Sequence, residues 1–238
     1  MNKTERIDNS RVLATCVRAF FEAFAMGVID SAYSDAATEA KLKPKHVKQA
    51  MLDHYGSVGE AFFDQMFYTV AQLTYGSADE AVAEVSRRCG GQASIPDYMR
   101  VACRTDAFYE AMLGEYKRNF TALLGGQIPP VGEHVKARCR DVEAGDVEAL
   151  LALRLVVRLT IRSYVKGLRA DKEGSHKFSQ VSLLRMLAAN LNLLTRDAAI
   201  DGDFNTVDEL LLHVCGSEEG FAAMSEEMNN TMNELFAN

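Results

Sequence analysis

The densest group of side chains that could do chemistry lies early in the sequence, where four lysines and a histidine fall within eight positions. The group consists of Lys41, Lys43, Lys45, His46 and Lys48, and Gln49 follows it. Lysines at this density can neutralise phosphates, and a glutamine amide can read an adenine edge. The group therefore predicts a helix that binds nucleic acid, and a solvated basic surface helix explains it equally well.

A second group of cations recurs at every fourth position of a segment rich in leucine and valine. Its members are Arg154, Arg158, Arg162 and Lys166. Residues four apart share one helix face and like charges repel there, so acidic side chains, solvent or an anionic ligand must compensate them. Pairing with acids of other helices is the commoner arrangement.

We also expect a ligand pocket beside these cations. The alternative is that the aromatic residues assigned to this pocket belong to the hydrophobic core. Its expected lining is Tyr116, Phe120, Arg158, Arg162 and Tyr164.

Signatures of catalysis are missing from the sequence. We find no glycine-rich phosphate loop, no HExxH, no GxSxG and no Cys/His spacing that fixes a metal. The five cysteines are scattered and odd in number, which predicts free thiols. The pairs Glu218-Glu219 and Glu226-Glu227 are typical of a solvated helix face. We therefore expect a protein that is not an enzyme and that needs no metal or cofactor.

The composition is that of a soluble globular protein. The 238 residues are 48% hydrophobic and 25% charged, and the mean hydropathy is −0.10. We expect no membrane span and no signal peptide, hence a cytoplasmic location. The net charge of −7 is uneven, because residues 1–58 hold eight basic and seven acidic residues while the remainder is acidic. The basic group thus stands out locally.

Helical periodicity with few prolines predicts an all-α fold without a sheet. The first helix is expected over 9–26 with Gly27 ending it, a short second helix over 33–40, and a third from Lys43-Pro44 to Gly56-Ser57. Further helices are expected at 58–75, 78–89, 97–124, 131–143, 146–169, 176–198, 203–215 and 217–236.

The N-terminal segment resembles the TetR family of bacterial transcriptional regulators. The phenylalanine-rich end of the first helix, residues 20–27, followed by residues 32–42, is similar to the family's first two helices. Residues 52–62, with His54, Tyr55, Ser57 and Glu60, are similar to its later motif. The resemblance implies a helix-turn-helix domain at 1–57 that binds double-stranded DNA and a helical domain at 58–238 that binds a small molecule and forms a homodimer.

The expected DNA contacts combine the basic group with the end of the third helix. They are Lys43, Lys45, His46, Lys48, Gln49, Tyr55 and Ser57. The alternative is a helical homodimeric ligand-sensing or protein-interaction protein that has lost DNA binding. Ala32 and Val58, which replace a hydroxyl residue and a lysine of the family motif, favour that alternative.

Two leucine-rich helix faces in the last third predict the dimer interface. The residues are Leu183, Leu184, Leu187, Leu191, Leu194, Leu210, Leu211 and Val214. The alternative is that these side chains fill the core of the single chain.

Overall fold

The expected all-α class is confirmed. The computed structural model describes residues 1–32, 44–126, 146–170, 172, 177–195, 200 and 202–236. Helices account for 82% of these residues, in ten segments. The helices expected at 33–40 and 131–143 lie outside the described residues, as do Lys41, Lys43 and Cys139.

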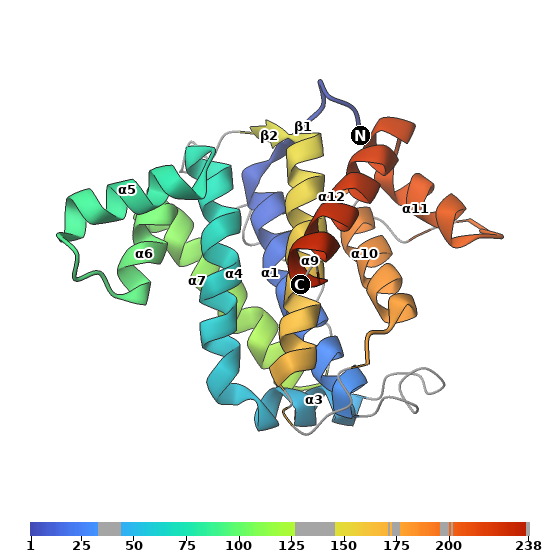
Figure 1. Ribbon diagram of the computed structural model, residues 1–238, viewed down its shortest axis with the longest axis horizontal. Coiled ribbons are helices and arrows are strands. Elements are labelled where there is room, and N and C mark those ends of the chain that lie inside the picture. The colour runs from blue at the N-terminus through green and yellow to red at the C-terminus, as the bar shows by residue number, and fades with distance from the viewer. Residues whose placement is uncertain are drawn as a thin grey trace.

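Two long helices that lie side by side form the centre of the molecule: α1 (Asn9–Ala32) and α9 (Ala149–Ala170) (Figure 1). Each follows a short strand, β1 (Arg6–Asp8) or β2 (Asp146–Glu148), and these strands pair antiparallel with Ile7 opposite Val147. The expectation of no sheet is therefore wrong in this detail. Three-residue strands are too short to show alternation in a sequence. The strand pair holds the starts of both helices together.

The expected end of the first helix at Gly27 is also wrong, because α1 continues to Ala32. Gly27 lies where α1 meets Gly167 of α9, so close that a Cβ on Gly27 would lie 2.7 Å from the amide nitrogen of Leu168. Glycine is thus required by helix packing here and does not terminate the helix.

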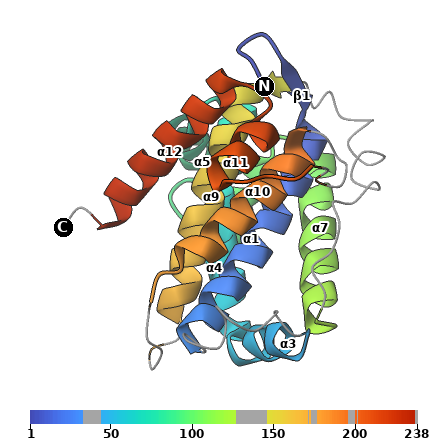
Figure 2. The ribbon, with the colours of Figure 1, turned by 90° about the vertical axis from the view of Figure 1, so that its right-hand side faces the viewer.

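In the part of the chain that the structure describes, eight further helices pack on this pair or on its neighbours (Figures 1 and 2). They are α3 (Pro44–Asp53), α4 (Tyr55–Tyr75), α5 (Ala78–Cys89), α6 (Ile95–Ala102), α7 (Asp106–Leu124), α10 (Gln180–Thr195), α11 (Val207–Cys215) and α12 (Glu218–Phe236). α12 lies along α9, while α3 lies across the end of the bundle next to α1 and α7.

Two helix boundaries differ from the expectation for local reasons. The helix expected over 97–124 is split, because Arg104 adopts a left-handed conformation at φ 60° and the Thr105 hydroxyl accepts a hydrogen bond from Phe108 N to begin α7. The third helix ends at Asp53, and Gly56 and Ser57 lie in the first turn of α4. Only His54 separates α3 from α4.

One continuous set of buried hydrophobic side chains spans the boundary expected at residue 57. Phe20 and Phe21 of α1 pack against Phe62 of α4 at ring-centroid distances of 5.2 and 5.7 Å. A buried polar link joins α1 to α10: Arg18 lies 2.8 Å from Glu22, and Asn190 donates a hydrogen bond to Glu22. Residues 1–57 therefore share their core with the rest of the chain.

The leucine face expected to dimerise faces the core of the single chain. Six of its eight residues are buried at 3% exposure or less: Leu183, Leu187, Leu191, Leu194, Leu211 and Val214. The alternative interpretation is correct for this face, because α10 and α11 use it to pack on each other and α10 also packs on α1 and α9.

In the described part of the chain, α1 is long and apolar enough by composition to cross a membrane, which the sequence analysis did not expect. Within the protein, 94% of its most apolar window is buried. That burial is typical of the core helix of a soluble protein, and the cytoplasmic location remains a prediction.

Candidate functional site

The cationic face of α9 is compensated by carboxylates from two other helices. Arg154 contacts Glu226 at 2.6 Å, Arg158 and Arg162 contact Glu234 at 2.9 and 3.1 Å, and Lys166 contacts Asp64 at 2.6 Å. Glu227 lies 3.6 Å from Arg158. The expected pairing with acids of other helices is confirmed. The interpretation of Glu226-Glu227 as a solvated face is wrong for Glu227, whose side chain is only 13% exposed.

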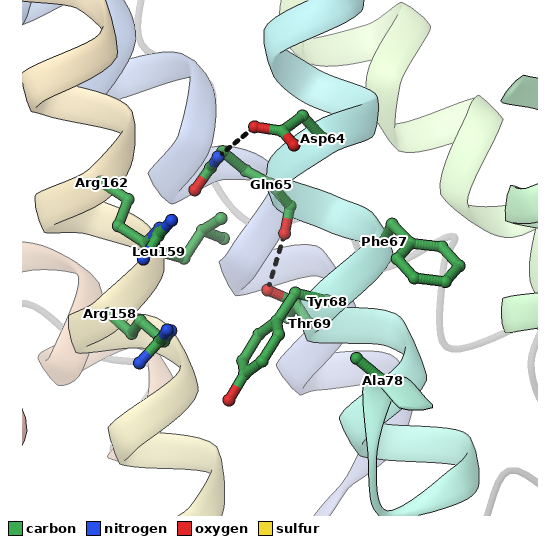
Figure 3. Close-up of a pocket in the computed structure, with 9 residues that line it drawn as sticks. All are labelled: Asp64, Gln65, Phe67, Tyr68, Thr69, Ala78, Arg158, Leu159 and Arg162. Atoms are coloured by element: carbon green, nitrogen blue, oxygen red, sulfur yellow. Dashed lines mark hydrogen bonds between the residues drawn. The ribbon is translucent and has the colours of Figure 1, made fainter. Parts of the chain in front are cut away.

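A cleft of about 260 Å³ opens between α4 and α9 beside these ion pairs (Figure 3). α9 contributes Arg158, Leu159 and Arg162, and α4 contributes side chains between Asp64 and Thr69. The Arg158 guanidinium lies beside the Tyr68 ring, and the Arg162 guanidinium points toward α4 next to Leu159 (Figure 3). The cleft therefore combines two fixed cations with an aromatic face.

Arg158 is held more firmly than a surface arginine. Its two terminal nitrogens contact the two carboxylate oxygens of Glu234 at 3.1 and 2.9 Å, and its guanidinium carbon lies 4.6 Å from the centre of the Tyr68 ring. Burial opposes its charge, but the hydrogen bond to Glu234 and the neighbouring charges outweigh burial and raise the pKa of Arg158. Arg158 is thus a permanent, oriented cation in the cleft.

Asp64 forms the acidic end of the cleft. Its carboxylate accepts hydrogen bonds from Lys166 and from Gln65, whose side-chain nitrogen lies 2.7 Å away. Partial burial works against ionisation, but the hydrogen bond and charge of Lys166 prevail and lower the pKa of Asp64. A ligand in the cleft would therefore meet cations at one end and a carboxylate at the other.

Tyr164 does not join Arg158 and Arg162. It is completely buried on another face of α9, where its hydroxyl donates to Asp30 of α1 at 2.6 Å and accepts from the amide of Ser179 at 2.9 Å. Burial, together with the hydrogen bond to Asp30, raises the pKa of Tyr164. Tyr164 links three parts of the fold and does not line the cleft.

Tyr116 and Phe120 are also placed away from the two arginines. Their stacked rings lie on α7, where Tyr116 packs 4.7 Å from Phe62 and Phe120 packs 5.5 Å from Tyr55. The expected five-residue pocket is thus divided among three places. The alternative, that these aromatic residues belong to the core, fits their contacts.

The described part of the basic group lies on the outer face of α3. Lys45, Lys48 and Gln49 are exposed and His46 is partly buried, while Val47, Ala50 and Met51 face the interior. The Gln49 side chain donates to Asp53 at 2.6 Å. The exposed face therefore carries two lysines, a glutamine and one acid.

Tyr55 and Ser57 begin α4 beside this face. Tyr55 is 65% exposed and rests against Phe120, and the Ser57 hydroxyl donates to the carbonyl of His54 at 3.1 Å. Lys45, Lys48, Gln49, Tyr55 and Ser57 thus lie at the same end of the bundle, on or next to the junction of α3 and α4.

Sequence reasoning missed Asp64, Gln65, Tyr68, Glu227 and Glu234 as members of the cleft or its border. Asp64, Gln65 and Tyr68 lie on the helix expected at 58–75, but nothing in their spacing shows that this helix, α4, lies against α9. No group of three metal-ligating side chains occurs in the described ranges.

Comparison with protein-family models, with curated proteins and with solved structures finds no match to this chain.

Proposed function

We propose that this protein is a ligand-responsive regulator, in which the cleft between α4 and α9 receives a small molecule and the outer face of α3 binds double-stranded DNA. The observation that carries the proposal is the continuity of α3 and α4. His54 alone separates them, and α4 continues from there to the cleft residues between Asp64 and Thr69. A ligand that moves α4 against α9 must also move α3.

The proposed DNA contacts follow from exposure and charge. Lys45 and Lys48 are exposed cations that can neutralise phosphates, and Gln49 is an exposed amide that can read a base edge. Tyr55 and Ser57 lie next to them at the start of α4, where hydroxyl groups can bind the phosphate backbone. His46 and Lys43, adjacent in sequence, belong to the same proposal.

Regulation would arise from differential affinity. A ligand that binds more tightly to one position of α4 stabilises the corresponding position of α3, and it weakens DNA binding if that position fits the groove poorly. This mechanism requires binding but no chemical step.

DNA binding is tested by replacing Lys45 and Lys48 together with alanine. We expect weaker binding to fragmented genomic DNA at about 50 mM salt, and a log–log salt slope reduced by roughly one unit for each lost phosphate contact. Lys3 and Lys117, exposed lysines elsewhere on the chain, provide a matched control with the same change in net charge. Equal DNA affinity of the two double variants would refute a specific role for α3.

The second candidate is a helical ligand-sensing or protein-interaction protein without DNA binding. The observation that favours it is the burial of α1 along α9, since a helix held in this way belongs to the same core as the ligand cleft. The acidic total charge, Ala32 and Val58 favour it as well. Absence of any DNA affinity at about 50 mM salt would support this candidate against the first.

Both candidates include a homodimer. Because the leucines of α10 and α11 are largely buried, the proposed interface must use another surface of the chain. Light scattering at micromolar concentration tests this part of the proposal, and a monomeric mass would reject it.

A further inference from the structure

We propose that Arg158 and Arg162, which line the cleft between α4 and α9, recognise a carboxylate group there. The carboxylate of Glu234, which binds both guanidinium groups from α12 without lining the cleft, gives up these hydrogen bonds when the ligand binds. The inference rests on the proposed ligand-binding role of the cleft. It adds the chemical class of the ligand and the segment of the chain that responds to it.

The geometry around Glu234 is that of a carboxylate-binding site. Both carboxylate oxygens accept hydrogen bonds from the two terminal nitrogens of Arg158, and Arg162 donates to one of them at 3.1 Å. Proteins recognise carboxylates with this geometry, in which two guanidinium groups bind one carboxylate and one of the two groups donates to both of its oxygens.

Glu234 is accessible to a competing carboxylate. The Glu234 side chain is 46% exposed, and it lies in the last turn of α12. Water and salt compete for the exposed Glu234 carboxylate, but its bidentate contact with the largely buried Arg158 makes this pair stronger than an ordinary surface ion pair. A free carboxylate can make the same hydrogen bonds to Arg158 and Arg162 without loss of any contact by the arginines.

The rest of α12 remains fixed when Glu234 leaves. About two turns earlier, Glu226 and Glu227 contact Arg154 at 2.6 and 3.8 Å, and about one turn earlier Thr231 is completely buried. Only the final turn, which ends with the half-exposed Phe236 against Phe178, depends on the Glu234 contacts. Ligand binding would therefore loosen this turn and leave the helix in place.

The cleft also favours a carboxylate attached to a flat or apolar group. Tyr68 presents its ring beside Arg158, and Leu159 adds an apolar side chain. Benzoate matches both features and is a suitable probe, with acetate as the probe that lacks the ring and inorganic phosphate as the probe that lacks a carboxylate.

The test compares benzoate binding to the wild-type protein, to Glu234→Gln and to Glu226→Gln, by NMR titration at constant ionic strength. Glu226→Gln is the matched control, because it removes the same charge from the same helix at an ion pair whose arginine does not line the cleft. If Arg158 and Arg162 are free of Glu234 for one-tenth of the time, Glu234→Gln raises the affinity about tenfold, since apparent affinity scales with the competent fraction. Glu226→Gln leaves it unchanged.

Hydrogen exchange of the last turn of α12 gives an independent readout. We expect benzoate to accelerate exchange at Glu234, Leu235 and Phe236 in the wild type and in Glu226→Gln. In Glu234→Gln, exchange is already fast and benzoate adds nothing. If the ion pair between Glu234 and Arg158 only stabilised the helix, Glu234→Gln would exchange faster in this turn, but benzoate would not accelerate exchange in the wild type.

The outcomes separate this inference from the proposal on which it rests. If the wild type binds benzoate at the cleft, but Glu234→Gln and Glu226→Gln bind it equally well, the displacement of Glu234 is refuted and the ligand cleft stands. Phosphate binding that is as strong as benzoate binding and equally enhanced in Glu234→Gln refutes the carboxylate assignment. If no probe binds the wild type or Glu234→Gln, both the inference and the ligand role of the cleft are overturned.

Discussion

Gly27 of α1 and Gly167 of α9 face each other where the two central helices make backbone contact. A Cβ on Gly167 would lie 3.0 Å from the carbonyl carbon of Phe24 and 3.1 Å from the Cα of Gly27. Gly27 is the nineteenth residue of α1 and Gly167 the nineteenth of α9, so the two helices run in the same direction from their paired strands. The absence of both side chains sets how closely the central pair can pack.

Replacing either glycine with alanine should destabilise the protein by about 1–3 kcal/mol or more, because the added methyl group meets backbone atoms that cannot rotate away. Urea unfolding followed by circular dichroism measures the loss. Gly59→Ala is the control, since its Cβ would lie 3.8 Å from the nearest atom, and there the better helix propensity of alanine should stabilise by up to about 1 kcal/mol. Equal stability of Gly27→Ala and Gly59→Ala would show that the helices can separate freely.

Tyr164→Phe should cost about 1–3 kcal/mol, because it removes one of the hydrogen bonds to the buried Asp30 carboxyl group and also removes the hydroxyl that accepts from the Ser179 amide. Tyr98→Phe, on the partly exposed surface of α6, should change the free energy of unfolding by less than about 0.5 kcal/mol. A Tyr164→Phe protein as stable as Tyr98→Phe would mean that water replaces the hydroxyl.

The stability contributed by Asp30 should decrease as the pH rises. Burial raises the pKa of Asp30, and the hydrogen bonds from Tyr164 and Ser182 only partly offset this effect. The folded protein therefore holds the proton more tightly than the unfolded chain, in which the pKa is about 3.9. The contribution is complete below that value and is lost as the pH rises through the folded-state pKa.

Comparison with Asp30→Asn isolates this effect, since the amide cannot ionise. The free energy of unfolding of the wild type minus that of the variant should fall as the pH rises above about 4. A difference that stays constant or increases with pH would contradict the raised pKa.

Glu226→Gln should lower the free energy of unfolding by less than about 1 kcal/mol, because the Glu226 and Arg154 side chains are 60% and 33% exposed. The loss should shrink further at high salt, which screens exposed charges. Thermal unfolding at low and high salt measures it. A larger, salt-independent loss would disqualify this variant as the control for Glu234→Gln.

The fold class and several helix boundaries could be predicted because they depend on local periodicity, and α5 has the expected bounds of 78–89. Gly27 was misread because a glycine in a helical pattern signals either an end or a close contact. Its partner, Gly167, is 140 residues away. The sequence does not show which helices will meet.

The candidate site was predicted in part for the same reason. The sequence predicted that acidic groups compensate the charges on α9, and the structure confirms this. The partners Asp64 and Glu234 could not be predicted, because they come from helices whose positions only the fold determines. The grouping of Tyr164 with Arg162 could have been rejected from the sequence. Residues two apart lie about 200° apart around a helix, so these side chains point in nearly opposite directions.

The pairing of α1 with α9 has a consequence for the synthesis of the chain. α1 leaves the ribosome long before its partner exists, and at about 5–20 residues per second the 140 residues between Gly27 and Gly167 take roughly 7–28 s to translate. During this interval a 24-residue helix whose side chains are almost all destined for the interior has no surface to cover it. We therefore expect the nascent chain to expose the apolar side chains of α1 until α9 has been made, which is the kind of segment that chaperones hold.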